Sequence, residues 1–186
     1  MTRPTAPDTT STSHIPAWVN PDLHRLMVVN TKPGQSQAYQ AWAQSLIALP
    51  AGAIFARINK VTAAESPTYT SIQTNLNQHV ELNSDLKYIN HSCDPTLELD
   101  TETMEFKVAR HRPLQRGDVL SFFYPSSEWR MAQPFECWCG AADEKCLGLI
   151  EGAEMMDPER LRAYHPNPHV VRQLGDKYDK NESVVR

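Results

Sequence analysis

The sequence predicts a mainly β domain with short strands and little helix. Several short segments are rich in β-branched and aromatic side chains, and turn residues separate them. The connections between these segments are irregular, and the sequence contains no internal repeat. A chain of 186 residues suits one domain with tails. These observations indicate a β class without saying which β architecture it is.

The expected strands lie in the first two thirds of the chain. They are the segments Leu26–Asn30, Ala53–Ile58, Tyr69–Thr74, Leu97–Asp100, Glu105–Ala109 and Val119–Tyr124. The last segment is the strongest candidate because it reads Val-Leu-Ser-Phe-Phe-Tyr and is entered through a turn at Arg116-Gly117-Asp118.

Helix is expected in two places. Gln35–Leu49 is rich in Ala, Gln and Leu, contains no breaker and ends at Pro50-Ala51-Gly52, which predicts a helix. The polar tail from Asp157 predicts one short helix that begins at Pro158, followed by a disordered end. The Thr-, Ser- and Pro-rich segment 1–13 also predicts disorder.

Charge and composition exclude some functions. The net charge is −4 and the isoelectric point is near 6.0, which argues against direct binding of nucleic acid. A mildly acidic surface suits a basic peptide, although solubility alone also explains it. The sequence contains no run of about 20 apolar residues that could span a bilayer. Its N-terminus lacks the apolar stretch of a signal peptide, so we expect a cytoplasmic or nuclear protein.

The cysteines predict a structural zinc site. Cys137, Cys139 and Cys146 form the pattern Cys-Trp-Cys-Gly-x5-Cys, and Cys93 is the one other cysteine. Zinc takes four thiolate or imidazole ligands in a tetrahedron, and an irregular loop that contains glycine can fold three thiols around one ion. Cys93 would complete the set and pin the C-terminal segment to the middle of the chain. Inert thiols or disulfides are the alternatives, although Cys-x-Cys is too tight for a comfortable mutual disulfide and reduced thiols are expected inside cells.

A second group of polar residues lies in the segment Lys87–Pro95, which reads Lys-Tyr-Ile-Asn-His-Ser-Cys-Asp-Pro. Such a loop must satisfy its polar groups locally or present them to a ligand. Cys93 beside His91 could also be a catalytic nucleophile and its base. Closeness in sequence does not by itself give the geometry that this chemistry needs, and the zinc count already uses Cys93.

Three ordered motifs resemble those of SET-domain protein-lysine methyltransferases. Asn90–Pro95 is similar to the Asn-His-Ser-Cys signature of that family, and Gly117–Tyr124 looks like its "GEELTFDY" element. Cys137–Gly148 looks like the post-SET zinc motif. The resemblance covers roughly residues 52–153, and Phe123–Trp129 with Ala132–Phe135 resembles a small branch of stand-alone microbial SET proteins.

The resemblance implies a SET-domain fold of small β-sheets around a pseudoknot, with a zinc-bound post-SET segment. The implied organisation is a disordered tail at 1–14, the SET domain at 15–134, the post-SET zinc segment at 135–153 and a polar C-terminal tail with a short helix at 154–186. The implied function is transfer of a methyl group from S-adenosylmethionine to a lysine amine on a basic peptide or protein.

The resemblance also assigns site residues. Tyr124 would be the catalytic tyrosine, and Asn90 and His91 would hold the cofactor, largely through the backbone. Phe122 and Tyr69 would line the substrate channel. The four cysteines would be the zinc ligands.

The sequence departs from the family in three places. The N-terminal Gly-x-Gly should lie between Lys32 and Ala43, where the sequence has one glycine and then the predicted helix; Trp42 could there form an aromatic wall for the cofactor. Phe123 replaces an aspartate, and the spacing between Cys139 and Cys146 is two residues longer than usual. The alternative function is therefore a repurposed SET scaffold that does not methylate protein lysine and serves as a binding module or acts on a small molecule.

Overall fold

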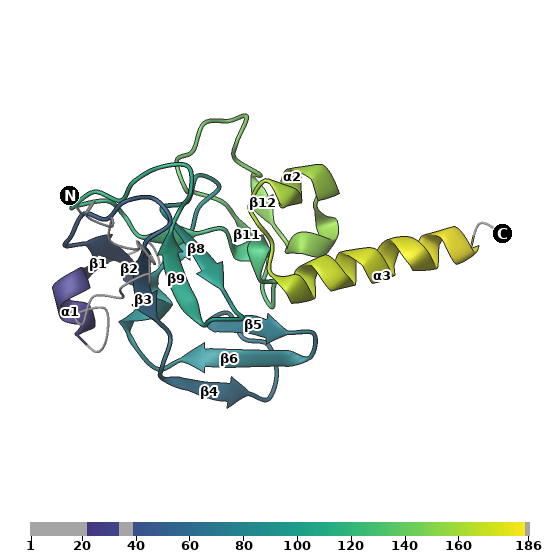
Figure 1. Ribbon diagram of the computed structural model, residues 1–186, viewed down its shortest axis with the longest axis horizontal. Coiled ribbons are helices and arrows are strands. Elements are labelled where there is room, and N and C mark those ends of the chain that lie inside the picture. The colour runs from purple at the N-terminus through teal and green to yellow at the C-terminus, as the bar shows by residue number, and fades with distance from the viewer. Residues whose placement is uncertain (1–21, 34–38, 185–186) are drawn as a thin grey trace, which may run out of the picture.

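The computed structural model describes residues 22–33 and 39–184. Small β-sheets form most of the molecule, and the helix at the C-terminal end projects from it (Figure 1). The prediction of a mainly β domain built from small sheets is confirmed. The predicted disorder of residues 1–14 and the first residues of the predicted helix, 35–38, lie outside the described residues.

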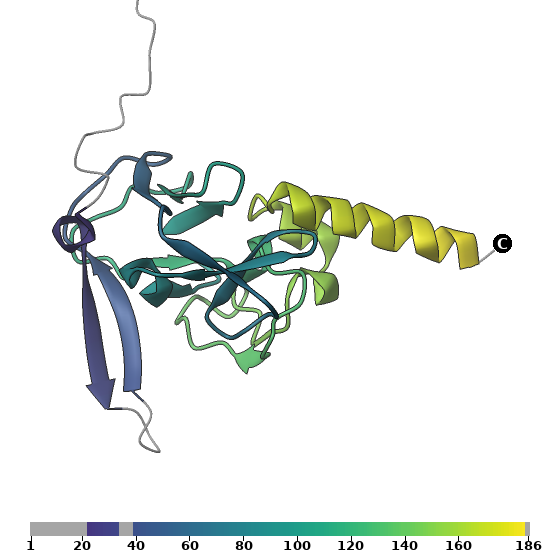
Figure 2. The ribbon, with the colours of Figure 1, turned by 90° about the horizontal axis from the view of Figure 1, so that it is seen from below.

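The N-terminal part is a β-hairpin that extends away from the other sheets (Figure 2). A short helix, α1 (Leu23–Leu26), leads into β1 (Met27–Pro33), which pairs antiparallel with β2 (Tyr39–Ser45). The helix predicted over Gln35–Leu49 is therefore wrong wherever the structure describes this segment. Pairing along all of β1 outweighs the helix propensity of its Ala and Gln residues.

Two three-stranded sheets follow the hairpin. The first has the order β3-β9-β8 and is built from β3 (Ile54–Arg57), β8 (Leu97–Asp100) and β9 (Glu105–Val108). Buried and half-buried residues alternate along β8, as expected for a strand with one face on the core. The turn before β9 is stabilised by Asp100, whose Oδ1 accepts the backbone N–H groups of Glu102 and Thr103 at 3.0 Å.

The second sheet has the order β4-β6-β5. It consists of β4 (Val61–Ala64), β5 (Ser71–Asn75) and β6 (Gln78–Leu82). The sequence predicted β5 but not its neighbours, because β4 is largely exposed and β6 is mostly polar.

Two very short strand pairs join distant segments. β7 (Asn90–His91) runs parallel to β10 (Ser121–Phe122). The first two of the three motifs named above therefore lie side by side. β11 (Phe135–Glu136) pairs antiparallel with β12 (Leu149–Ile150). The strand predicted over Val119–Tyr124 is shorter than expected, because a 3₁₀ helix with Pro125 in its first turn begins at Tyr124.

The core has two parts. The larger part lies between the sheets and the β1–β2 hairpin, and it is built around Phe55, Leu97, Phe106 and Leu120. The smaller part joins the C-terminal segment to the middle of the chain, and its buried members are Cys93, Phe123, Ile150, Ala153, Leu161, Val170 and Leu174.

The C-terminal segment contains two helices. The predicted helix is α2 (Pro158–Arg162), capped by Asp157, whose carboxylate accepts two backbone N–H groups at 3.0 Å. The disordered end predicted for this tail is wrong as far as residue 184, because the longer α3 (Pro168–Val184) follows; disorder was expected because this sequence is polar and its apolar residues are few. No helix in the described ranges is long and apolar enough to cross a membrane.

Buried Asn167 attaches the start of α3 to the rest of the fold. Its amide nitrogen donates to the carbonyls of Leu99 and Ser126, both at 3.0 Å. Its side-chain oxygen accepts from the backbone and the hydroxyl of Thr101, at 2.9 and 3.0 Å. One side chain therefore connects β8, the turn that follows it and the segment after Tyr124.

Replacement of Asn167 should lower the stability of the whole fold. Asn167→Ala leaves buried backbone groups of Leu99 and Thr101 without partners, so we expect a loss of about 3 kcal/mol in the free energy of unfolding. Urea titration followed by circular dichroism measures it. Asn83→Ala, which removes an exposed hydrogen bond to Thr62, is the control and should cost under about 0.5 kcal/mol. Equal losses in the two variants would contradict this role.

Candidate functional site

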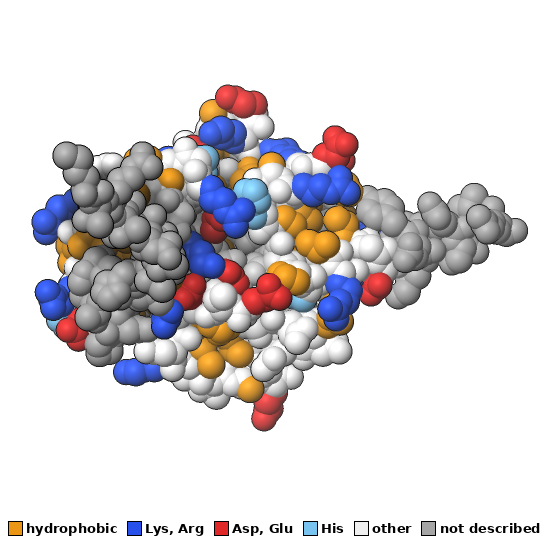
Figure 3. Space-filling view, in the orientation of Figure 1, with side chains coloured by type: hydrophobic (Ala, Val, Ile, Leu, Met, Phe, Trp, Pro, Cys, Tyr) orange, Lys and Arg blue, Asp and Glu red, His pale blue; other side chains and the backbone are white. Residues whose placement is uncertain are grey.

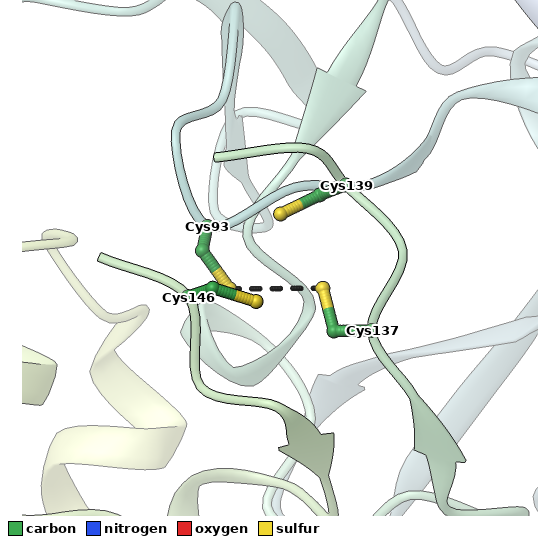
Figure 4. Close-up of side chains that lie close together, drawn as sticks. All are labelled: Cys93, Cys137, Cys139 and Cys146. Atoms are coloured by element: carbon green, nitrogen blue, oxygen red, sulfur yellow. Dashed lines mark hydrogen bonds between the residues drawn. The ribbon is translucent and has the colours of Figure 1, made fainter. Parts of the chain in front are cut away.

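The four cysteine side chains converge on one point (Figure 4). All four Sγ atoms lie within 4.8 Å of one another, and those of Cys93 and Cys137 are 3.9 Å apart. Cys93 follows β7, Cys137 and Cys139 follow β11, and Cys146 precedes β12. All four are free cysteines, so the disulfide alternative is not the one that the structure adopts.

These sulfur positions fit a tetrahedral metal ion. A Zn–S bond of about 2.3 Å places neighbouring sulfurs of a tetrahedron about 3.8 Å apart, close to the Cys93–Cys137 separation. The longer spacing between Cys139 and Cys146 accommodates a turn at 143–145. The cluster could therefore hold a metal ion and tie the 137–146 segment to the loop after β7.

His91 connects the cysteine cluster to Tyr124. Its Nδ1 accepts the backbone N–H of Tyr124 at 3.2 Å, and its Nε2 lies 3.3 Å from the Sγ of Cys93. Because Nδ1 is an acceptor, the proton resides on Nε2, which donates to the sulfur. Burial lowers the pKa of His91 to about 4, so the ring is neutral at ordinary pH.

This geometry bears on the alternative of a cysteine nucleophile. His91 and Cys93 do meet, so the structure supplies a contact that closeness in sequence alone did not guarantee. However, His91 donates a hydrogen bond to the sulfur instead of removing a proton from it. Cys93 is also only 1% exposed and lies among three other thiols. A substrate could not reach this sulfur.

Four of the predicted site residues line one cavity, whose volume is about 390 Å³. Its walls come from the segment that leads into β5, the loop before β7, β10 and the segment after it. The predicted residues in its lining are Tyr69, Asn90, Phe122 and Tyr124. Phe122 and Tyr124 face each other with ring centroids 4.7 Å apart. The structure thus gathers the predicted tyrosine and both predicted channel residues in one place.

The phenol of Tyr124 is held inside the protein. Its hydroxyl donates to the carbonyl of Ile89 at 3.3 Å, and the His91 ring packs edge-on against it at 5.3 Å. Burial raises the pKa of Tyr124 well above its usual value, and the nearby charge of Glu128 raises it further. The phenol is therefore neutral, and its oxygen keeps a lone pair that can accept a hydrogen bond.

The remaining predicted residues lie outside that lining. His91 lies behind Tyr124, as described above. Trp42 is half-buried on β2, with the Lys32 ammonium 6.0 Å from its ring. Trp42 is connected to the cavity indirectly. The side chain of Asn90, which lines the cavity, donates to the carbonyl of Ala41, the residue before Trp42, at 2.8 Å.

Sequence reasoning missed Glu128, a carboxylate that also lines the cavity. Only 6% of this residue is exposed, and its Oε1 accepts the backbone N–H of Gln73 at 2.6 Å. Burial raises the pKa of Glu128 to about 7, although the hydrogen bonds from Gln73 and Ser127 lower it. The available signal was in the local sequence. Glu128 is an acidic residue four positions after Tyr124, in a segment that is otherwise apolar and rich in hydroxyl groups.

A second cavity, of about 520 Å³, adjoins the other core cluster and is lined in part by Cys93, Phe123 and Tyr164. Its lining includes the ion pairs of Lys145 with Asp94 and of Arg110 with Glu98. On the face shown in Figure 3, acidic and basic side chains are likewise interspersed.

Comparison with known proteins gives the class: this chain belongs to a family of methyltransferases. The relative that shows it is methyltransferase flvH of Aspergillus flavus, which is 48% identical over 163 residues. The match covers 88% of this chain and 89% of that relative. No family model matches the sequence.

Among solved structures, the crystal structure of KRYPTONITE in complex with mCHG DNA and SAH is similar to this one. The sequences are 15% identical and the TM-score is 0.47. The match covers 66% of this chain and 29% of that chain.

Proposed function

We propose that this protein is a SET-type N-methyltransferase that transfers a methyl group from S-adenosylmethionine to a lysine amine on a protein or peptide. The observation that carries the proposal is the cavity in which Tyr124 and Phe122 meet Asn90, in a chain whose relative is a methyltransferase. The parallel pairing of β7 with β10 supports it, because that pairing brings together the first two of the three motifs that resemble the SET family.

The residues of the cavity suit an amine as the methyl acceptor. S-adenosylmethionine supplies an electrophilic methyl group on a sulfonium, and the protein must align the amine with it and exclude water. The aromatic rings of Phe122 and Tyr124 can surround the alkyl stem of the acceptor. Because the Tyr124 hydroxyl proton points to Ile89, the phenol oxygen can accept an N–H from the amine and orient its lone pair.

We assign cofactor binding to Asn90, His91 and Trp42. Asn90 is exposed at the edge of the cavity and bonded to β2, which carries Trp42. The hairpin removes one objection, since a helix does not occupy residues 39–45, where the sequence analysis expected it to replace the glycine loop.

We assign zinc to the four-cysteine cluster, with a structural role. The donors are four soft sulfur atoms at a spacing that suits this ion. The ion would pin the 135–153 segment to the loop after β7. The division of the chain at residues 134 and 153, and a cytoplasmic or nuclear location, stay predictions.

The methyltransferase relative favours methyl transfer over the alternative of a scaffold that only binds. The alternative also allowed a small molecule as the substrate. If that molecule is the methyl acceptor, it differs from the main proposal only in what carries the amine. A lysine side chain and a free amine present the same group to the cavity.

Removal of one cysteine should release the metal. We expect the purified protein to carry about one zinc ion per chain and Cys139→Ala to lose it, with faster hydrogen exchange in the 135–153 segment. Plasma mass spectrometry measures the metal. Glu144→Gln, in the same loop, is the control and should retain zinc. A metal-free wild-type protein whose four thiols all react freely in the native state would show that the assignment is wrong.

Loss of the Tyr124 hydroxyl should slow methyl transfer. Tyr124→Phe removes one oxygen and keeps the ring, so turnover should fall roughly 10²-fold while cofactor affinity changes far less. Transfer of radioactive methyl groups from S-adenosylmethionine to lysine-containing peptides and to free L-lysine measures this and compares the two acceptor classes. Thr62→Val, which removes an exposed hydroxyl outside the cavity lining, is the control. Unchanged turnover in Tyr124→Phe would exclude a catalytic role for this phenol.

A further inference from the structure

Two glutamates are equally buried in this protein but differ in their partners. Glu105 and Glu128 are each 6% exposed. Glu105 has two cationic partners, since its carboxylate lies 3.0 Å from Arg57 Nε and 3.6 Å from Lys107 Nζ. Among the described residues, the one basic side chain within ion-pair distance of Glu128 is His79, whose Nε2 lies 3.7 Å from Oε2.

His79 does not supply a full positive charge to Glu128. Burial lowers the pKa of His79, and the charge of His169 lowers it further, so the ring is neutral near neutral pH. Gln73 and Ser127 donate hydrogen bonds to Oε1, but both donors are uncharged. A buried carboxylate without a cation is costly, and a cationic ligand would offset that cost.

Glu128 is also held rigidly. Gln73 bonds to this segment twice, because its backbone N–H donates to Glu128 Oε1 and its side-chain oxygen accepts the backbone N–H of Trp129 at 2.9 Å. His169 on α3 bonds to the carbonyl of Ser127 at 2.8 Å. These contacts hold the carboxylate as a fixed part of the cavity wall.

The charges around the cavity favour a cation at Glu128. Glu128 is the acidic residue of the described lining, and Lys87 is its basic residue. Lys87 is exposed, with its ammonium 5.1 Å from the ring of Tyr88, whereas Glu128 is buried near Tyr124. A molecule with an alkyl stem and a terminal ammonium matches a cavity that has aromatic side chains and a buried carboxylate in its lining.

We propose that Glu128 binds the ammonium group of the acceptor substrate in this cavity, which makes it the residue that selects a cationic amine. This inference rests on the proposed function, because it names how the acceptor of that reaction is recognised. The bound ammonium must release one proton before its nitrogen lone pair can take the methyl group, and the Glu128 carboxylate can accept that proton. Neutral molecules with the same alkyl stem would form no ion pair with the carboxylate.

The test compares two probes that differ in their head group, n-pentylammonium and n-pentanol. Calorimetry should show that Glu128→Gln binds n-pentylammonium at least tenfold more weakly than the wild type, while the two proteins bind n-pentanol equally. Glu105→Gln removes a buried charge outside the cavity and should bind both probes as the wild type does, whatever its loss of stability. Thermal unfolding verifies that each variant is folded at the assay temperature.

The dependence on pH gives a second readout. The pKa of Glu128 is raised to about 7, so the carboxylate is mostly protonated at pH 6 and ionised at pH 8, while the probe stays cationic. Wild-type affinity for n-pentylammonium should therefore be roughly tenfold higher at pH 8, and that of Glu128→Gln should not change. Glu128→Gln at the two pH values is also the control for the neighbouring groups, which are His79 and His169, whose pKa values are lowered, and Tyr124, whose pKa is raised.

Equal affinity of the wild type and Glu128→Gln for n-pentylammonium would overturn the proposal, and so would a wild type that does not bind it. Failure of the proposed function would look different. It would appear as an absence of S-adenosylmethionine binding in a separate titration. The wild type would still bind n-pentylammonium more tightly than Glu128→Gln does.

Discussion

The contact between Cys93 and the three cysteines of the 137–146 segment is the constraint on which the rest of the site depends. Cys93 accepts a hydrogen bond from His91, and His91 accepts one from the backbone of Tyr124. The position of the phenol in the cavity is thus coupled to the sulfur cluster through one neutral ring. Tyr164 also helps to hold Cys93 in place, because its hydroxyl donates to the Cys93 carbonyl at 2.9 Å.

The opposite side of the cavity depends on the C-terminal segment. Asn167 and His169 bond to the backbone of Ser126 and Ser127, and Gly152 lies against the backbone of Trp129. A Cβ atom at Gly152 would lie 2.5 Å from the Trp129 carbonyl, so only glycine allows this approach. The C-terminal segment therefore supports the part of the chain that carries Glu128.

The predictable features were those that depend on local pattern or on ligand chemistry. Leu97–Asp100, a short segment set off by turn residues, was predicted as a strand with the bounds that β8 has, and the number and spacing of the cysteines predicted their convergence. Tyr39–Ser45 was predicted wrongly because its pairing partner, not its composition, decides its conformation. Glu128 was missed because its partner Gln73 lies 55 residues away. The local sequence shows only that an acidic residue is present, and not which distant partner buries it.

The central claim is that this methyltransferase uses S-adenosylmethionine, and one titration tests it most directly. Calorimetric titration of the cofactor into the zinc-loaded protein should show saturable binding of about one molecule per chain at concentrations below roughly 1 mM. Asp94→Asn, near the cysteine cluster but outside the assigned cofactor residues, should bind equally. Absence of binding by the wild type at millimolar cofactor, in a protein that is folded and carries zinc, would contradict the account.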